Sequence, residues 1–183
     1  MAADFELTDD DLRVVVRYAT QWATEVLPVF ERAQPGDERP RAAIEAARQF
    51  VGGAPRSARQ RTAAFEAHRA AKAAPSEAAR LAAQSAGDAA AAAYLHPIAK
   101  AHQVGHILRA AANRALVAEL ESGGDPVVGS EMIEVVCRRT PPELVDVLCR
   151  YPESRGGASR GSRLMADLDR RLRASRLRPD LDV

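Results

Sequence analysis

Apolar side chains recur at helical spacing along most of this chain. The longest such run follows Thr8 and consists of Leu12, Val15, Val16, Ala19, Trp22, Ala23, Val26 and Phe30. Intervals of three and four residues, held over about five turns, predict one amphipathic helix. Thr8 and Asp11 stand at the two positions of a capping box at its start. Pro28 is expected to kink or end this helix.

Start and stop signals divide the rest of the chain into further helices. The predicted starts are Pro40, the capping pair Ser57 and Gln60, Pro75, the residues after Pro97, Asp125-Pro126, Thr140-Pro141-Pro142-Glu143, and the end of a Gly/Ser/Arg loop at residues 155–162. The fourth helix should reach Tyr94, and the fifth should follow Pro97 directly. We find no segment that favours a strand, because the β-branched runs lie inside helical periodicity.

The pattern therefore predicts an all-α fold, a compact bundle of about seven or eight helices with short loops. We expect one domain over residues 1–183, with a flexible tail from about residue 176. Alanine makes up about a fifth of the chain and forms an unbroken run at residues 89–93. Such small side chains predict a close approach of neighbouring helices. They also leave a homodimer open, since alanine-rich helices can pack between subunits.

Composition narrows the function classes. The 183 residues include 26 basic and 25 acidic side chains, which argues against a nucleic-acid-binding domain that relies on net charge. No apolar run is long enough to span a membrane, and the acidic N-terminus lacks the pattern of a secretory signal, so we expect a cytoplasmic protein. We find no phosphate-binding loop, dinucleotide fingerprint or complete metal motif, so we predict no cofactor and no metal.

The strongest local signal is histidine, because all four histidines lie between His68 and His106. His102 and His106 are four residues apart and should share a helix face. Gln103 stands where a zinc-protease motif would need glutamate. Three interpretations stay open: surface or structural histidines, a ligand pocket, and a metal site.

Several other side chains also allow both a structural and a ligand-binding interpretation. Arg39 and Arg41, oriented by Asp37, form either a fork for a carboxylate or phosphate or ordinary ion pairs at a helix start. Trp22 is either core or a pocket wall, and Tyr94 is either a pocket hydroxyl or the end of a buried helix. The full set of candidate ligand-binding residues is Trp22, Asp37, Arg39, Arg41, His68, Tyr94, His96, His102, Gln103 and His106.

Four strings give the chain a family resemblance. They are DERPRAAI at residues 37–44, AFEAH at 64–68, AAYLHPIA at 92–99 and QVGHIL at 103–108. They resemble actinobacterial immunity proteins with an Imm-5-like domain, over a region from about Leu7 to Leu172. Where many members have histidine after a glycine, this sequence has Gly87-Asp88. The resemblance implies protection against a toxin, and relatives in specialised-metabolite gene clusters imply a small-molecule role.

Two functions follow from these observations. In the first, the protein binds a small molecule or a cognate toxin in a pocket between helices and so confers immunity. In the second, it is an accessory enzyme of specialised metabolism, in which His96 and His106 act as general acid and base on an anionic intermediate. Whether the protein is an enzyme stays open at this point, because no nucleophile or metal set is complete.

Overall fold

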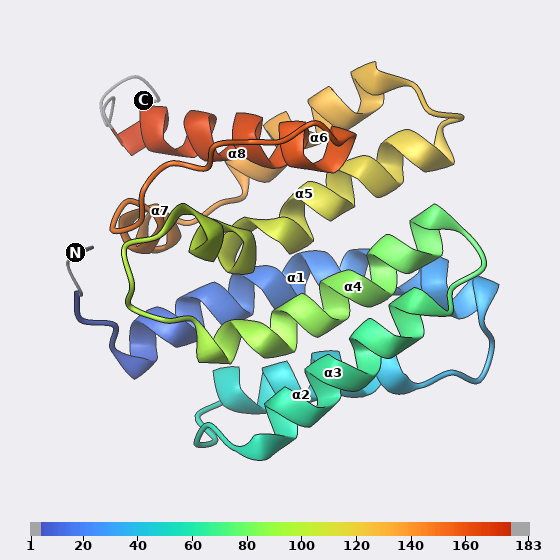
Figure 1. The fold of residues 1–183 in the computed structure, drawn as a ribbon, viewed down its shortest axis with the longest axis horizontal. Coiled ribbons are helices and arrows are strands. Elements are labelled where there is room, and N and C mark those ends of the chain that lie inside the picture. The colour runs from blue at the N-terminus through green and yellow to red at the C-terminus, as the bar shows by residue number, and fades with distance from the viewer. Residues whose placement is uncertain (1–4, 177–183) are drawn as a thin grey trace.

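The computed structural model describes residues 5–176, which form eight α-helices and two 3-10 turns without a strand (Figure 1). The α-helices are α1 (Asp9–Ala33), α2 (Arg39–Val51), α3 (Ala58–Lys72), α4 (Glu77–Ala91), α5 (Val104–Glu121), α6 (Pro126–Arg138), α7 (Pro142–Leu148) and α8 (Arg160–Arg176). The turns η1 (Ala92–Tyr94) and η2 (Ala101–Gln103) lie between α4 and α5. The predicted all-α bundle is confirmed. Apart from Arg176, the tail that we expect to be flexible lies outside the described residues.

Local hydrogen bonds start the helices close to the predicted positions. The hydroxyl of Thr8 accepts from the backbone N–H of Asp11 at 3.1 Å, and the Asp11 carboxylate accepts from that of Thr8 at 3.0 Å. Ser57 and Gln60 form the same reciprocal pair at the start of α3. The fourth helix begins slightly later than predicted, because Ser76 caps it in place of Pro75. These starts depend on nearby residues alone, which makes them readable from the sequence.

Pro28 does not end α1, which continues to Ala33. Proline removes one backbone hydrogen bond wherever it stands inside a helix. Pro28 is exposed, so the missing bond falls on the solvent side, where water can replace it. The apolar face of α1 is therefore continuous from Leu12 to Phe30.

The segment between α4 and α5 differs most from the prediction. The α4 helix ends at Ala91 and tightens into η1, and α5 starts only at Val104. Pro97 disfavours a helical conformation at His96, and two long-range bonds fix His96 outside any helix. Its carbonyl accepts from the Tyr151 hydroxyl at 2.9 Å, and its N–H donates to Gln103 Oε1 at 3.3 Å.

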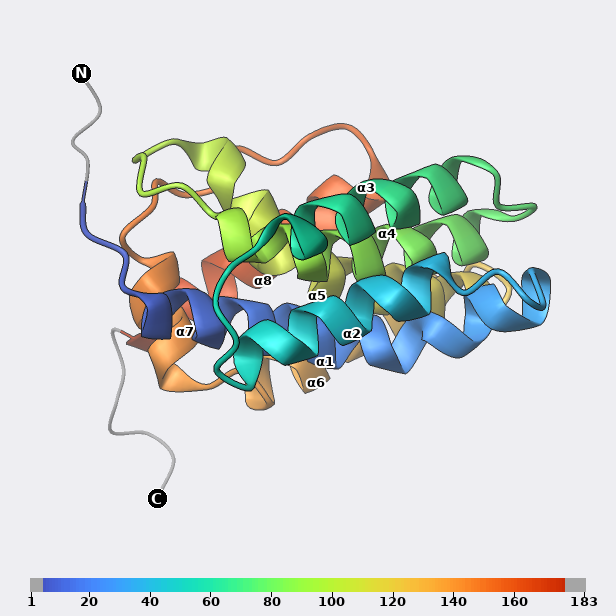
Figure 2. The same cartoon turned by 90° about the horizontal axis from the view of Figure 1, so that it is seen from below.

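The α4 helix lies at the centre of the bundle and packs against α1, α2, α3 and α5. In Figure 1 α1 runs behind α4, and Figure 2 shows α1 and α2 as a layer beneath α3 and α4. Alanines with no exposed surface lie on both helices and belong to one hydrophobic core, namely Ala19 and Ala23 on α1 and Ala86, Ala89 and Ala90 on α4. The predicted close approach of helices around residues 89–93 is confirmed.

The two cysteines, Cys137 and Cys149, are free thiols and half-buried. Burial raises the pKa of the Cys137 thiol.

Among residues 5–176, no helix is both long enough and apolar enough to cross a lipid bilayer.

Candidate functional site

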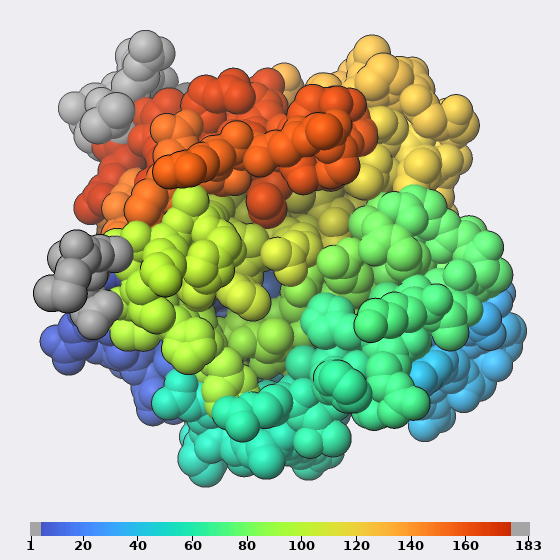
Figure 3. Space-filling view, in the orientation of Figure 1, coloured from blue at the N-terminus to red at the C-terminus, as the bar shows by residue number. Residues whose placement is uncertain are grey.

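Three adjoining hollows form one trough along α4, on the side away from α1. The central hollow, about 320 Å³, lies between α3, α4 and α5. The α8 hollow, about 430 Å³, continues it toward the start of α8, and shares Arg80, Gln84 and Arg109 with it. The η1 hollow, about 400 Å³, continues it toward η1, and shares Ala91 and His106 with it. Figure 3 shows the face of the molecule on which the trough opens, hollowed near the centre of the view.

The most unusual group in the trough is Asp88, a carboxylate on α4 that lines the central hollow and is only 2% exposed. Its Oδ1 accepts from Nη1 of Arg109 at 3.1 Å, and Nε2 of His68 lies 3.8 Å from the same oxygen. Its Oδ2 is buried and has no hydrogen-bond partner among the described residues. Burial raises the pKa of Asp88 to about 6, although Arg109 opposes the increase.

Two glycines allow this cluster to form. A Cβ atom at Gly87 would lie 2.8 Å from Cε1 of His68, which real Cβ atoms do not tolerate. A Cβ atom at Gly105 would collide with Nη2 of Arg109. Glycine at both positions lets the imidazole and the guanidinium lie directly on the helix backbones. The two partners of Asp88 reach it for this reason.

His106, on α5, is the histidine most enclosed by the trough. It lines both the central and the η1 hollows, and its Nδ1 is buried without a partner among residues 5–176. Burial lowers the pKa of His106, and the positive charges of Arg109 and the other three histidines lower it further. The pKa of His68 is also lowered, first by burial and then by Arg109 and Lys72. Both rings are therefore neutral at neutral pH.

The residues around η1 and η2 divide into two groups. His96 and Tyr94 line the η1 hollow, although the Tyr94 hydroxyl already donates to the carbonyl of Ser57. His102 is exposed, and its Nε2 lies 2.8 Å from Nε2 of Gln103. Neither His102 nor Gln103 lines the trough. The expectation that His102 and His106 share a helix face is wrong, because His102 belongs to η2, which precedes α5.

The remaining candidates lie elsewhere. Trp22 is fully buried in the core and packs edge-on against Tyr18. Arg39 forms a two-pronged ion pair with Asp37 at the start of α2, with Nε–Oδ1 and Nη2–Oδ2 distances of 2.9 and 2.6 Å. Arg41 pairs with Glu31. The structure does not bring these side chains together with the histidines, and none of them lines the trough.

The structure adds residues that the sequence analysis did not select. They line the α8 and central hollows and include Glu77, Arg80, Gln84 and Asp88. A signal for Asp88 does exist in the sequence, since it is the one charged residue in an alanine-rich stretch from residue 81 to residue 93. A charge on such an apolar helix needs a partner from another element. Periodicity alone does not identify Arg109 as that partner.

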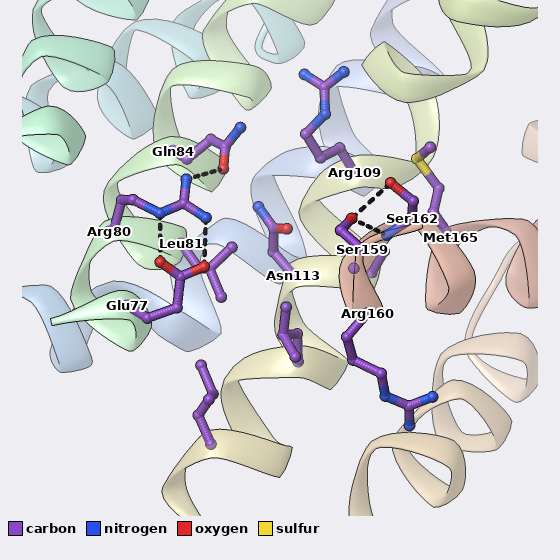
Figure 4. A pocket seen from close by; sticks show the side chains of 14 residues that line it. Glu77, Arg80, Leu81, Gln84, Arg109, Asn113, Ser159, Arg160, Ser162 and Met165 are labelled. Carbon is purple, nitrogen blue, oxygen red and sulfur yellow. Dashed lines mark hydrogen bonds and ion pairs between the residues drawn. The ribbon is translucent and has the colours of Figure 1, made fainter. Parts of the chain in front are cut away.

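Figure 4 shows the α8 hollow from close by. On its α4 wall, the Arg80 guanidinium bridges Glu77 and Gln84, with Nη2–Oε1 and Nη1–Oε1 distances of 2.6 and 3.1 Å. Arg109 and Arg160 point in opposite directions in this view, and Arg160 pairs with Glu119 at 2.8 Å. The charged groups at this end of the trough are therefore already paired.

Fold and site together define a small helical protein with a trough between its helices that is lined by both apolar and charged side chains. The chain belongs to the family described as Imm-5 like putative immunity protein, which matches residues 6–140. This match includes α1 to α6 and all residues of the central and η1 hollows, whereas the wall formed by α8 lies beyond it. No curated protein and no solved structure matches the chain. Within the described part of the chain, no cluster of three or more histidine, cysteine or acidic side chains could hold a metal ion.

Proposed function

We propose that this protein confers immunity by binding a small toxic molecule in the trough along α4. The observation that carries the proposal is Asp88, whose buried Oδ2 lacks a partner among residues 5–176. Native proteins pair nearly all buried polar atoms, and an unpaired carboxylate oxygen is especially unfavourable. A ligand that shares a hydrogen bond with this oxygen would complete the site. Membership of an immunity protein family supports a protective role.

Size and surface favour a small molecule over a protein toxin. The hollows, of about 320 to 430 Å³, are of the size that encloses small ligands. Protein interfaces are anchored by clustered aromatic side chains, whereas only 4% of this chain is aromatic. The large hydrophobic side chains exposed on the described surface are Phe65, Leu120 and Val127.

One observation supports the enzymatic alternative. Asp88 and His106 each carry a buried atom without a partner among residues 5–176, and burial raises the pKa of the carboxyl and lowers that of the imidazole. A carboxyl whose pKa is raised toward the working pH is suited to general acid–base catalysis. Under this alternative the reacting pair is Asp88 and His106, because His96 is exposed at the end of the trough.

A ligand-retention experiment tests the proposed function. The protein is incubated with a small-molecule extract of its source cells and separated by gel filtration, and retained compounds are measured by mass spectrometry. We expect His106→Ala to retain at least tenfold less of the compound that the wild type retains. His102→Ala is the matched control, because it removes an exposed histidine outside the trough. Circular dichroism of both variants establishes that the helices are intact.

The outcomes separate the alternatives. Equal retention by wild type and His106→Ala, or no retained compound at all, would contradict binding in the trough. Recovery of the compound chemically unchanged, at one molecule per chain or less, supports a binder. Recovery of a converted product, at many molecules per chain, would replace the binder with the enzyme.

A further inference from the structure

We infer that the trough selects a small anion of the carboxylate or phosphate class, and that binding takes up a proton which Asp88 donates to the anion from Oδ2. This inference deepens the proposed function and rests on it. The proton comes from solvent and stays on Asp88 as a hydrogen bond to the ligand. No covalent bond forms or breaks.

The charge of the lining argues for an anion. The positive side chains that line the trough are Arg61, Lys72, Arg80, Arg109 and Arg160, and the negative ones are Glu77 and Asp88. Arg80 and Arg109 pair with these two carboxylates, and Arg160 pairs with Glu119. Within the described residues, Arg61 and Lys72 form no ion pair, and Arg61 instead stacks over the ring of Tyr94 at 4.6 Å. Two cations at the central and η1 hollows are thus available to a ligand of opposite charge.

The geometry of Asp88 assigns its role. Arg109 occupies Oδ1, which leaves Oδ2 as the position for a proton. An ionised Asp88 would repel an anion, whereas the protonated form can donate a short, charge-assisted O–H···O⁻ hydrogen bond. Protonation also removes the negative charge that neutralises Arg109, so the guanidinium becomes a third cation of the site. A single proton on Asp88 therefore makes both Asp88 and Arg109 more favourable neighbours for an anion.

Two half-buried histidines near Asp88 change their charge in the same direction as Asp88. The titratable and charged groups that face the trough are Arg61, His68 and Lys72 on α3, Glu77 and Arg80 on α4, Tyr94 in η1, His96 after it, His106 and Arg109 on α5, and Arg160 on α8. His68 and His106 are neutral at neutral pH and gain positive charge as the pH falls. Asp88, with a pKa of about 6, loses negative charge over the same range. Affinity for an anion should therefore weaken about tenfold for each pH unit above 6 from Asp88 alone.

Sulfate and acetate are suitable probes because both keep their charge between pH 5.5 and pH 7.5, in the range where Asp88 titrates. Each is added to the whole protein at constant ionic strength, and the imidazole signals of His68 and His106 are followed by NMR at pH 5.5, 6.5 and 7.5. We expect saturable shifts whose dissociation constants rise about tenfold from pH 6.5 to pH 7.5. Tighter sulfate points to a phosphate-like ligand, and tighter acetate points to a carboxylate.

Two variants identify the proton acceptor. Asp88→Asn carries a permanently neutral group that can donate from its amide, so it should bind at pH 7.5 about thirtyfold more tightly than the wild type and lose most of the pH dependence. Asp37→Asn is the matched control, because it also removes a carboxylate paired with arginine, but outside the trough. It should behave as the wild type.

The inference fails if neither anion shifts the two signals, if binding weakens as the pH falls, or if Asp88→Asn keeps the pH dependence of the wild type. The ligand-retention experiment separates this failure from failure of the proposed function. If a compound is retained in a way that depends on His106 but neither anion binds, the proposed function stands and only the preference for an anion is wrong. If neither retention nor anion binding is observed, the trough is not a ligand site.

Discussion

Two buried aspartates of this molecule each pair with an arginine, but they differ in how many of their carboxylate oxygens have a hydrogen-bond partner. Asp169, on α8, has no exposed surface and both of its oxygens are occupied. Its Oδ1 accepts from Nε of Arg173 and its Oδ2 from the backbone N–H of Ser154, both at 2.6 Å. Asp88 is equally buried, but its Oδ1 bond to Arg109 is longer, at 3.1 Å, and its Oδ2 has no partner among the described residues.

The difference lies in how much of the fold each carboxylate holds together. Arg173 also donates to the carbonyl of Tyr151 at 2.9 Å, so the Asp169 pair ties the chain around residues 151–154 to α8. Asp88 connects α4 to α5 through one bond and lines the central hollow, while its second oxygen is buried without a partner among the described residues. Burial alone therefore does not distinguish structure from function, whereas the number of satisfied oxygens does.

The largest effect should follow from Asp169→Ala. It leaves the Arg173 guanidinium, about one fifth exposed, without its carboxylate and frees the Ser154 N–H. Removing one partner of a buried ion pair lowers the free energy of unfolding by about 3–5 kcal/mol. Urea denaturation measures the loss, and Asp167→Ala, on the exposed side of the same helix, should lose less than about 1 kcal/mol. If Asp169→Ala also lowers the free energy of unfolding by less than about 1 kcal/mol, Asp169 does not stabilise the fold as its two hydrogen bonds predict.

Asp88→Asn should change the pH dependence of stability more than stability itself. The folded pKa of about 6 exceeds the unfolded value of 3.8, so the contribution of Asp88 to stability is full below about pH 4 and is lost as the pH rises through 6. The wild type should therefore lose about 2–3 kcal/mol between pH 4 and pH 8 that Asp88→Asn does not lose. Urea denaturation across this range tests the sign. Parallel stability curves for the two proteins would show that Asp88 is not held in an unfavourable charged state.

Gly105→Ala should have the smallest effect on stability and a specific effect on Asp88. The new methyl group displaces the flexible end of Arg109, while alanine gains about 1 kcal/mol of helix propensity, so stability should stay within about 1 kcal/mol of the wild type. Without Arg109 nearby, the pKa of Asp88 should rise above its value in the wild type. Carbon-13 NMR of the aspartate carboxyl groups measures it, and an unchanged pKa would mean that Arg109 does not control the charge of Asp88.

Local signals explain why the helices could be predicted. The capping residues Thr8 and Ser57 act on neighbours within three positions, and apolar periodicity extends through each helix. The segment between α4 and α5 could not be predicted, because His96 is fixed by the hydroxyl of Tyr151, which lies 55 positions away.

The candidate site could be predicted only in part, for the same reason. Clustering along the sequence led to His68, His96 and His106, which do line the trough. The Asp88–Arg109 pair depends on the packing of α4 against α5, which sequence spacing does not encode. Arg39, by contrast, is fully engaged by Asp37, two residues away, and a charged side chain satisfied so locally has little left for a ligand.

The alanine contact between α1 and α4 has a consequence for selectivity. Interlocked small side chains have no alternative rotamers, so the back of α4 cannot adjust when the trough fills. Under the proposed function, the floor that carries Asp88 would be preorganised, and entropy would be lost mainly by long rim side chains such as Arg61 and Lys72. Such a site would select ligands by size and shape, because its floor cannot rearrange to accept a molecule that does not fit.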